Sequence, residues 1–126
     1  MQASASSQHA ADGDEAAVIA VLTNLPDADA AARLSRALLE ARVCACVNRL
    51  APVESEYWWQ GKLEQATEWP LLAKTTRGRY AALEAVIQAN HPYDVPEIIA
   101  WPVSHGFGPY LAWVRDEVDP GAQGAD

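Results

Sequence analysis

The side chains best suited to hold a metal ion flank a short loop that contains two prolines. His91 precedes Pro92 and Glu97 follows Pro96, so a stiff segment separates an imidazole from a carboxylate. Imidazole suits Cu(II), Zn(II) and Ni(II), and a carboxylate adds negative charge. Two ligands make a weak site, so a second subunit would have to supply more. In the alternative interpretation His91 ends a helix or hydrogen-bonds a carbonyl, and Glu97 pairs with a base such as Lys74.

The two cysteines, Cys44 and Cys46, are separated by a single residue. Two thiolates on one face of a strand would suit Cu(I) or Zn(II), which makes Cys46 a further, weaker candidate for a metal ligand. Their apolar neighbours favour the alternative that both are small core residues. A disulfide between them would close a very small ring of poor geometry, so we expect reduced thiols.

Four aromatic side chains lie on a predicted β-hairpin: Tyr57, Trp58, Trp59 and Trp69. A domain of this size has little core in which to bury three tryptophans near a hairpin tip. These residues therefore predict a contact between subunits, because exposed aromatic surface often marks an interface. A small-molecule cleft at a subunit boundary is the alternative.

The sequence predicts no catalytic residues and no obligatory cofactor. Ser55 and Ser104 have no general base beside them and no nucleophile elbow around them. Residues 106–108 lack the length and the lysine of a phosphate loop. Lys74 could hold an anion near a helix N-terminus, or pair with Glu97. A site assembled from distant residues stays open, because catalytic triads are spatial rather than sequential.

The elements that must position these residues begin with a buried strand and a helix. Residues 18–22 form a short, continuous apolar run, which is typical of a strand covered on both faces. Asp27 then caps a helix or places negative charge in its first turn. The apolar face of this helix, at helical spacing, is Ala31, Leu34, Leu38 and Ala41.

A long β-hairpin is predicted next. An apolar run at 43–47 leads into residues 53–59, where side chains alternate with a period of two. Gln60–Gly61 is the turn, because glycine tolerates positive φ, and residues 62–75 return. Pro70 lacks an amide donor, which predicts a sheet edge or a bulge at that point.

The second half of the chain predicts a helix, a strand and a last helix. Thr76 is a suitable cap for a helix that ends at His91, because the following proline disfavours helical backbone there. Residues 97–101 predict a fourth strand, stopped by Pro102. Pro109 fits the first turn of a short final helix. The order predicts an α+β fold: a ferredoxin-like βαββαβ sandwich with a long β-hairpin and a short C-terminal helix.

Composition restricts the partners and the domain count. The chain has 126 residues, half of them apolar, which suits one domain. Its net charge of -8 repels phosphate backbones and acidic membranes, so we expect neither nucleic acid nor a membrane as a partner. We expect disordered tails at 1–16 and 119–126 around a single domain at 17–118. The N-terminus has no basic or apolar region typical of a secretory signal, which predicts a cytoplasmic protein.

Two motifs give the chain a family resemblance. They are Ser55-Glu-Tyr57-Trp-Trp59-Gln-Gly61-Lys62 and His91-Pro-Tyr93-Asp-Val-Pro96-Glu97. The matching order and spacing also include Cys46, Lys74-Thr75, Pro102-Val103 and Tyr110-Leu-Ala-Trp113. Together they resemble the CutA family over about residues 17–118.

The resemblance implies a ferredoxin-like fold similar to that of the PII signalling proteins. It also implies a tight homotrimer formed through edge strands and the long hairpin, and an association with tolerance to copper and other divalent metals. It implies no catalytic activity. Two departures weaken a soft Cu(I) site. Some members have a cysteine where this chain has Thr23, and some have a second histidine where it has Asn90.

Two functions of different classes follow from these observations. The first is a homotrimeric divalent-cation tolerance protein that binds Cu, Zn or another divalent ion near His91 and Glu97. The second is a PII-like regulatory or scaffolding trimer that binds a small ligand or a protein in clefts between subunits. An enzyme ranks third. Metal affinity that is lost in His91→Ala would separate the first function from the others.

Overall fold

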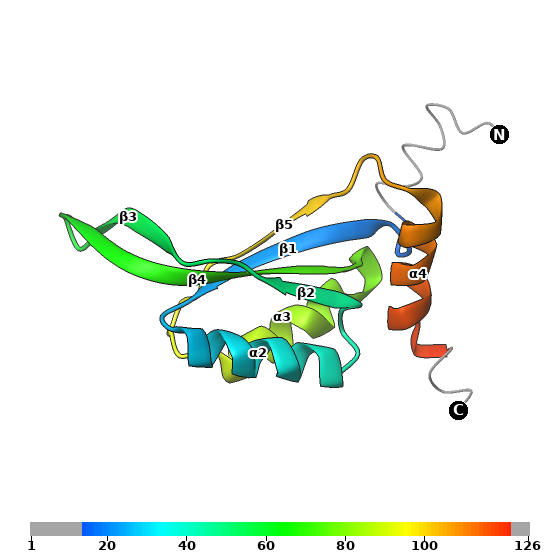
Figure 1. Cartoon of the computed structure of the whole chain (residues 1–126), viewed down its shortest axis with the longest axis horizontal. Coiled ribbons are helices and arrows are strands. Elements are labelled where there is room, and N and C mark those ends of the chain that lie inside the picture. Colours follow the sequence, from blue (N-terminus) through cyan, green and yellow to red (C-terminus); the bar gives the residue numbers. More distant parts are fainter. Residues whose placement is uncertain (1–13, 122–126) are drawn as a thin grey trace.

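The computed structural model describes residues 14–121, which form a five-stranded antiparallel sheet and three α-helices (Figure 1). The strands are β1 (Val18–Leu25), β2 (Cys46–Arg49), β3 (Val53–Trp59), β4 (Lys62–Thr76) and β5 (Ile98–Pro102). The helices are α2 (Ala28–Glu40), α3 (Tyr80–Asn90) and α4 (Gly108–Val118), with a 3-10 turn, η1, at Arg77–Arg79. Helices α2 and α3 lie side by side under one face of the sheet.

The sheet has the strand order β2-β4-β1-β5, and β3 pairs with the distal part of β4. All pairs are antiparallel. Strands β2 and β3 together occupy the place of one long strand, so the chain follows the βαββαβ order with its second strand broken in two. The predicted ferredoxin-like α+β fold, with its long hairpin and C-terminal helix, is confirmed.

The break between β2 and β3 is a β-bulge. The last residue of β2 in register with β4 is Arg49, opposite Leu71, and the first of β3 is Val53, opposite Glu68. Between these pairs, the three residues 50–52 lie opposite only the two residues 69–70 of β4. The Leu50 amide still donates to the Pro70 carbonyl, at 3.0 Å. Strand β4 has neighbours on both sides at this point, so of the two predicted alternatives for Pro70 the structure has the bulge.

Helix α2 begins at the predicted residue and ends one position early. The Oδ1 atom of Asp27 accepts a hydrogen bond from the Ala30 amide at 2.7 Å, which confirms the predicted cap. The buried residues of this helix are Ala30, Ala31, Leu34, Ser35 and Leu38. Ala41 was predicted on the apolar face but is exposed, because it is the C-cap and Arg42 then takes a left-handed backbone with φ 61°.

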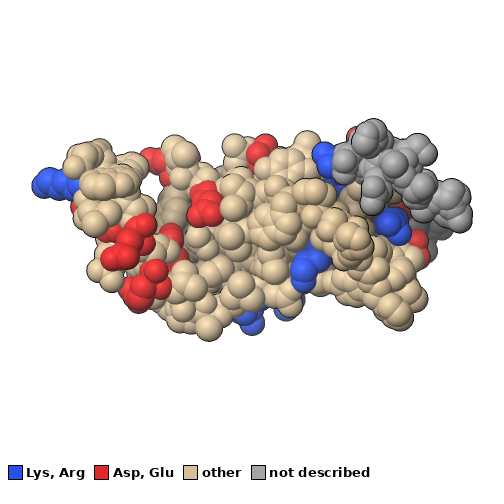
Figure 2. Space-filling view, turned by 90° about the horizontal axis from the view of Figure 1, so that it is seen from above, with Lys and Arg blue, Asp and Glu red and all other residues tan. Residues whose placement is uncertain are grey.

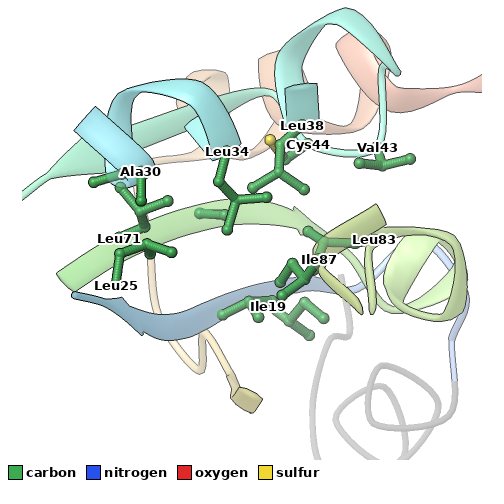
Figure 3. Close-up of a cluster of buried hydrophobic side chains, with 13 residues drawn as sticks. Ile19, Leu25, Ala30, Leu34, Leu38, Val43, Cys44, Leu71, Leu83 and Ile87 are labelled. Carbon is green, nitrogen blue, oxygen red and sulfur yellow. The ribbon is translucent and has the colours of Figure 1, made fainter. Parts of the chain in front are cut away.

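The hydrophobic core lies between the sheet and these two helices (Figure 3). Its members include Ile19, Val21 and Leu25 from β1, Leu34 and Leu38 from α2, Leu71 from β4, and Leu83 and Ile87 from α3. Cys44 belongs to the same cluster. The prediction that it is a small core residue is therefore confirmed.

Helix α3 starts later than predicted. Thr76 makes no side-chain capping hydrogen bond, and the 3-10 turn at Arg77–Arg79 separates it from the first helical residue, Tyr80. The predicted cap is therefore wrong. The helix does end where Pro92 requires, because His91 is the C-cap residue and has extended backbone with ψ 135°.

Strand β5 forms one edge of the sheet and pairs with β1. It runs from Ile98 to Pro102, one residue later than predicted. Pro102 was expected to stop the strand before itself, but it pairs with Ile19 as the last strand residue. A proline is tolerated there because an edge strand needs amide donors on one side only.

Helix α4 lies at one end of the sheet and contacts β1 and β4 (Figure 1). Val114 and Val118 are its buried residues, and Pro109 is in its first turn as predicted. Figure 2 shows the side of the molecule away from α2 and α3: its surface over the sheet is mostly uncharged, and acidic side chains gather toward the hairpin.

The ends of the predicted domain are partly described. Glu15, placed in the N-terminal tail by the sequence, accepts a hydrogen bond through its carbonyl from the Gly78 amide at 2.8 Å. Asp14 likewise accepts from the Ala17 amide at 3.0 Å. The rest of both predicted tails, 1–13 and 122–126, lies outside the described residues.

Candidate functional site

His91 joins the end of α3 to the end of β1. Its Nε2 atom lies 2.8 Å from the carbonyl oxygen of Asn24, and its Nδ1 atom accepts a hydrogen bond from the Tyr93 amide at 3.1 Å. Because Nδ1 is the acceptor, the neutral ring carries its proton on Nε2 and donates it to Asn24. The imidazole is buried, and both of its nitrogens are engaged.

Burial lowers the pKa of His91, and it outweighs the Asn24 carbonyl and the nearby Glu68 carboxylate, which both favour the charged ring. The geometry gives the same direction. A proton on Nδ1 would face the Tyr93 amide hydrogen, which that nitrogen now accepts. The surroundings of His91 therefore favour the neutral form of its ring.

This environment predicts a pH-dependent stability. A base whose pKa is lower in the folded state binds fewer protons there than in the unfolded chain, so the free energy of unfolding rises with pH. The His91 contribution is complete above its ordinary pKa of 6.5 and decreases as the pH falls below that value. We expect His91→Gln to make the free energy of unfolding less dependent on pH in this window, as measured by urea denaturation. His105→Gln, in an exposed loop, is the control, and equal pH slopes in both variants would contradict the assignment.

Asn24 contacts both of the predicted metal ligands, His91 and Glu97. Its carbonyl faces His91, and its Nδ2 atom donates to Oε1 of Glu97 at 3.0 Å. The structure thus supports the proximity of His91 and Glu97 that the loop predicted, through a residue that the sequence analysis did not single out. Glu97 is exposed and precedes β5 directly.

The donor set does not form a complete metal site within the described chain. Among residues 14–121, no group of three or more His, Cys, Asp or Glu side chains lies together in a way that would hold a metal ion. His91 could bind an ion only by giving up one of its two hydrogen bonds. A metal site at His91 and Glu97 stays a prediction that requires further ligands.

The same region contains a second interaction that the sequence did not predict. The Tyr93 hydroxyl donates to Oε2 of Glu68 at 3.1 Å, which ties the loop after α3 to β4. Burial and this hydrogen bond raise the pKa of Tyr93 to about 12, so the phenol keeps its proton. The rings of His91 and Tyr93 are in contact, with centroids 4.9 Å apart. In the sequence, only the motif at residues 91–97 drew attention to Tyr93, and it did not indicate Glu68 as the partner.

Cys44 and Cys46 lie in different surroundings. Cys44 is buried in the core, whereas Cys46 is partly exposed and opens β2. The Cys46 Sγ atom lies 3.4 Å from the Tyr110 hydroxyl and 3.7 Å from Nζ of Lys74. The idea that two thiols face one way on a strand is wrong, because β2 begins only at Cys46.

Of the two roles suggested for Lys74, the structure tests only the pairing with Glu97, and the anion site stays a prediction. The Nζ atom of Lys74 contacts the sulfur of Cys46 and donates to Oδ1 of Asn48. Lys74 pairs in register with Ala20, near the start of β1, whereas Glu97 contacts Asn24 near that strand's other end. The suggested Lys74–Glu97 ion pair is therefore not formed.

The four aromatic residues predicted at a subunit contact are divided between two places. Tyr57, Trp58 and Trp59 lie on β3, and all three are exposed. Trp69 lies near the base of the hairpin, pairs in register with Leu25 and packs against the hydrophobic core. The expectation that Trp69 lies near the hairpin tip is wrong, because β4 is long and continues into the sheet.

These features define the class of protein as a small ferredoxin-like α+β domain with a projecting hairpin. The sequence model of the family described as "CutA1 divalent ion tolerance protein" matches residues 19–117. The chain belongs to this divalent-cation tolerance family. Divalent-cation tolerance protein CutA of Pectobacterium atrosepticum is 42% identical over 97 residues, which cover 77% of this chain and 88% of that protein.

Solved structures agree with this membership. The crystal structure of CutA from Xylella fastidiosa superposes with a TM-score of 0.79 at 40% identity, and the match covers 81% of this chain and 98% of that one. The family is one of cation tolerance and is not a known enzyme family. No helix in the described part of this chain is long and apolar enough to cross a membrane.

The predicted cytoplasmic location is wrong by comparison with a relative. The structure from Archaeoglobus fulgidus is that of a periplasmic divalent cation tolerance protein CutA, with a TM-score of 0.78 at 33% identity. The match covers 81% of this chain and 99% of that one. The prediction rested on the lack of a secretory-signal pattern, and the absence of a pattern does not identify a compartment.

Proposed function

We propose that this chain takes part in divalent-cation tolerance as a homotrimer, with the hairpin and β5 as its contact surfaces. The observation that carries this proposal is the apolar surface of the hairpin. Trp58 is 75% exposed and Trp59 is 60% exposed in the single chain. Side chains of this size are costly to leave in water and are typical of a buried interface core.

The hairpin is also incomplete without a partner. Within the described residues β3 pairs only with β4, and these two strands project beyond the ends of the helices (Figure 1). The turn has two residues of positive φ, Gln60 at 51° and Gly61 at 80°, which fixes its register. A two-stranded ribbon is marginal in water without packing on a face. A neighbouring subunit would supply that packing.

Strand β5 provides a second surface of the same kind. Every residue of β5 after Ile98 is exposed, including Ile99 and Trp101. Ile99 and Trp101 lie on the same face of the strand, because side chains alternate with a period of two. A sheet edge without a partner strand among the described residues and with exposed apolar side chains is a surface that proteins usually cover. The copy number of three comes from the family resemblance, which implies a trimer formed by edge strands and the hairpin.

A second candidate function is direct binding of a divalent ion such as Cu(II) or Zn(II) at His91 and Glu97. The observation in its favour is that both side chains converge on Asn24. An ion would replace Asn24 as the partner of the two side chains, and a neighbouring subunit would complete the ligand set.

The trimer and the metal site are both tested by native mass spectrometry. The protein is titrated with Cu(II), and with Zn(II) in parallel. We expect a species with three times the chain mass of 13.6 kDa. If the metal candidate is correct, the species takes up a small saturating number of ions in the wild type and none in His91→Ala. His105→Ala is the matched control, since His105 is an exposed loop residue.

The two parts of the proposal fail separately in this experiment. A monomer at micromolar concentration would contradict the trimer. A trimer whose adducts are weak and equal in His91→Ala and His105→Ala would remove the metal site. That second outcome would leave a scaffolding or ligand-sensing trimer as the function.

A further inference from the structure

Three elements bring a nucleophile, a cation and a phenol together on the sheet. Cys46 opens β2, and Lys74 lies directly opposite it on β4 in the strand register. The Cys46 Sγ atom lies 3.7 Å from Nζ of Lys74 and 3.4 Å from the hydroxyl of Tyr110 on α4. Lys74 is itself held by Oδ1 of Asn48. We call these four residues the thiol cluster.

The sulfur is the acceptor in both contacts. An ammonium group has donors and no acceptor, so Lys74 can only donate. The hydrogen bond with Cys46 is the main cause that raises the pKa of Tyr110 to about 12, so this phenol keeps its proton at neutral pH and donates it. The Cys46 sulfur is therefore a partly exposed acceptor of one charged and one neutral donor.

The chain contains an internal contrast to this arrangement. Cys44 is 3% exposed among the aliphatic side chains of the core (Figure 3). Burial raises the pKa of its thiol to about 12. Buried thiols in apolar surroundings are chemically inert, whereas partly exposed thiols beside a cation react. Two cysteines separated by one residue therefore differ in their exposure and in the groups around their sulfur atoms, and both properties govern thiol reactivity.

We propose that Cys46 is a site of oxidation by hydroperoxides, with Lys74 and Tyr110 as positioning residues that stabilise its thiolate. The thiolate sulfur attacks one peroxide oxygen, so an S–O bond forms and the O–O bond breaks. Sulfur loses two electrons and becomes a sulfenic acid. The peroxide is reduced, and its second oxygen leaves as hydroxide or alkoxide. This leaving group takes up the proton that the thiol released to the solvent when it formed the thiolate, which gives water or an alcohol. No metal ion takes part in this step.

The sulfenic acid has no partner for a disulfide within the chain. Cys44 is the only other cysteine of the chain, and it is buried two positions away, where a disulfide would be strained. The oxidised state therefore persists until an external thiol attacks it. This inference is independent of whether His91 and Glu97 bind a metal ion.

The test exposes the full-length protein to hydrogen peroxide and dimedone, a cyclic diketone that traps sulfenic acids. A chelator in the buffer prevents oxidation by trace copper. Tandem mass spectrometry then assigns each adduct to Cys44 or Cys46. We expect adducts on Cys46 and none on Cys44, and no adduct in Cys46→Ser. Adducts on both cysteines at equal rates, or on neither, would overturn the proposal.

A second measurement tests the positioning residues by the rate of alkylation with iodoacetamide. Lys74→Met removes the charge and keeps the length of the side chain. We expect it to slow alkylation of Cys46 at neutral pH by about fivefold and to displace the rate profile to higher pH. Tyr110→Phe should act in the same direction. Lys62→Met, at the tip of the hairpin, is the matched control.

Circular dichroism shows whether each variant is folded. A folded Lys74→Met protein that reacts at the rate of Lys62→Met would exclude the role of the ammonium group. Faster alkylation of Cys44 than of Cys46 in the wild type would exclude the thiol cluster as a reactive site, whatever the variants do.

Discussion

Leu83→Ala is expected to lower the free energy of unfolding by about 2–5 kcal/mol, more than any other single truncation proposed for this chain. Leu83 is 0% exposed and lies on α3, where it packs in the cluster between the helices and the sheet (Figure 3). The loss combines the lost burial of the side chain with the cavity left behind. Urea denaturation at one fixed protein concentration measures it, because oligomers gain stability with concentration.

Leu39→Ala is the matched control for this prediction. It deletes the same atoms from α2, but Leu39 is 37% exposed. We expect a loss below about 1 kcal/mol, since partial exposure reduces the burial that is lost and leaves no closed cavity. If both variants lost equal stability, the core would not be organised around α3 as the structure has it.

The sequence predicted those parts of the fold that depend on neighbouring residues. Asp27 and Ala30 form a cap within one turn, and the Gln60–Gly61 turn follows from the backbone freedom of one glycine. The interruption of the second strand was harder to place. Pro70 indicated a sheet edge or a bulge, but the choice and the position of the bulge depend on a register between strands that are separated by the whole hairpin. Local signals do not encode a register directly.

The contacts of the candidate site were even harder to predict from local sequence signals. His91 and Glu97 were recognised from their residue types and from the two prolines between them. The group that holds them, Asn24, is 67 positions from His91 in the chain. An asparagine at the end of an apolar strand has no local pattern that predicts such a contact. Tyr110 and Cys46 are 64 positions apart, and only the packing of α4 brings them together.

The double substitution Trp58→Ser and Trp59→Ser is expected to convert the proposed trimer into monomers. Truncation of a buried interface tryptophan typically costs about 2 kcal/mol or more. Two such losses, if they add, raise the dissociation constant about a thousandfold. Sedimentation velocity at micromolar concentration should show the wild type at three times 13.6 kDa and the variant at 13.6 kDa.

This prediction separates an interface role from a role in the stability of the single chain. Trp58 pairs in register with Leu63 on a hairpin that is remote from the core, so its removal should leave the secondary structure of the monomer intact. Leu39→Ser, on the helix side of the sheet, is the control and should remain trimeric. If the double variant stayed trimeric and folded, the hairpin would not form the contact. Strand β5, exposed along most of its length, would then be the surface that joins the subunits.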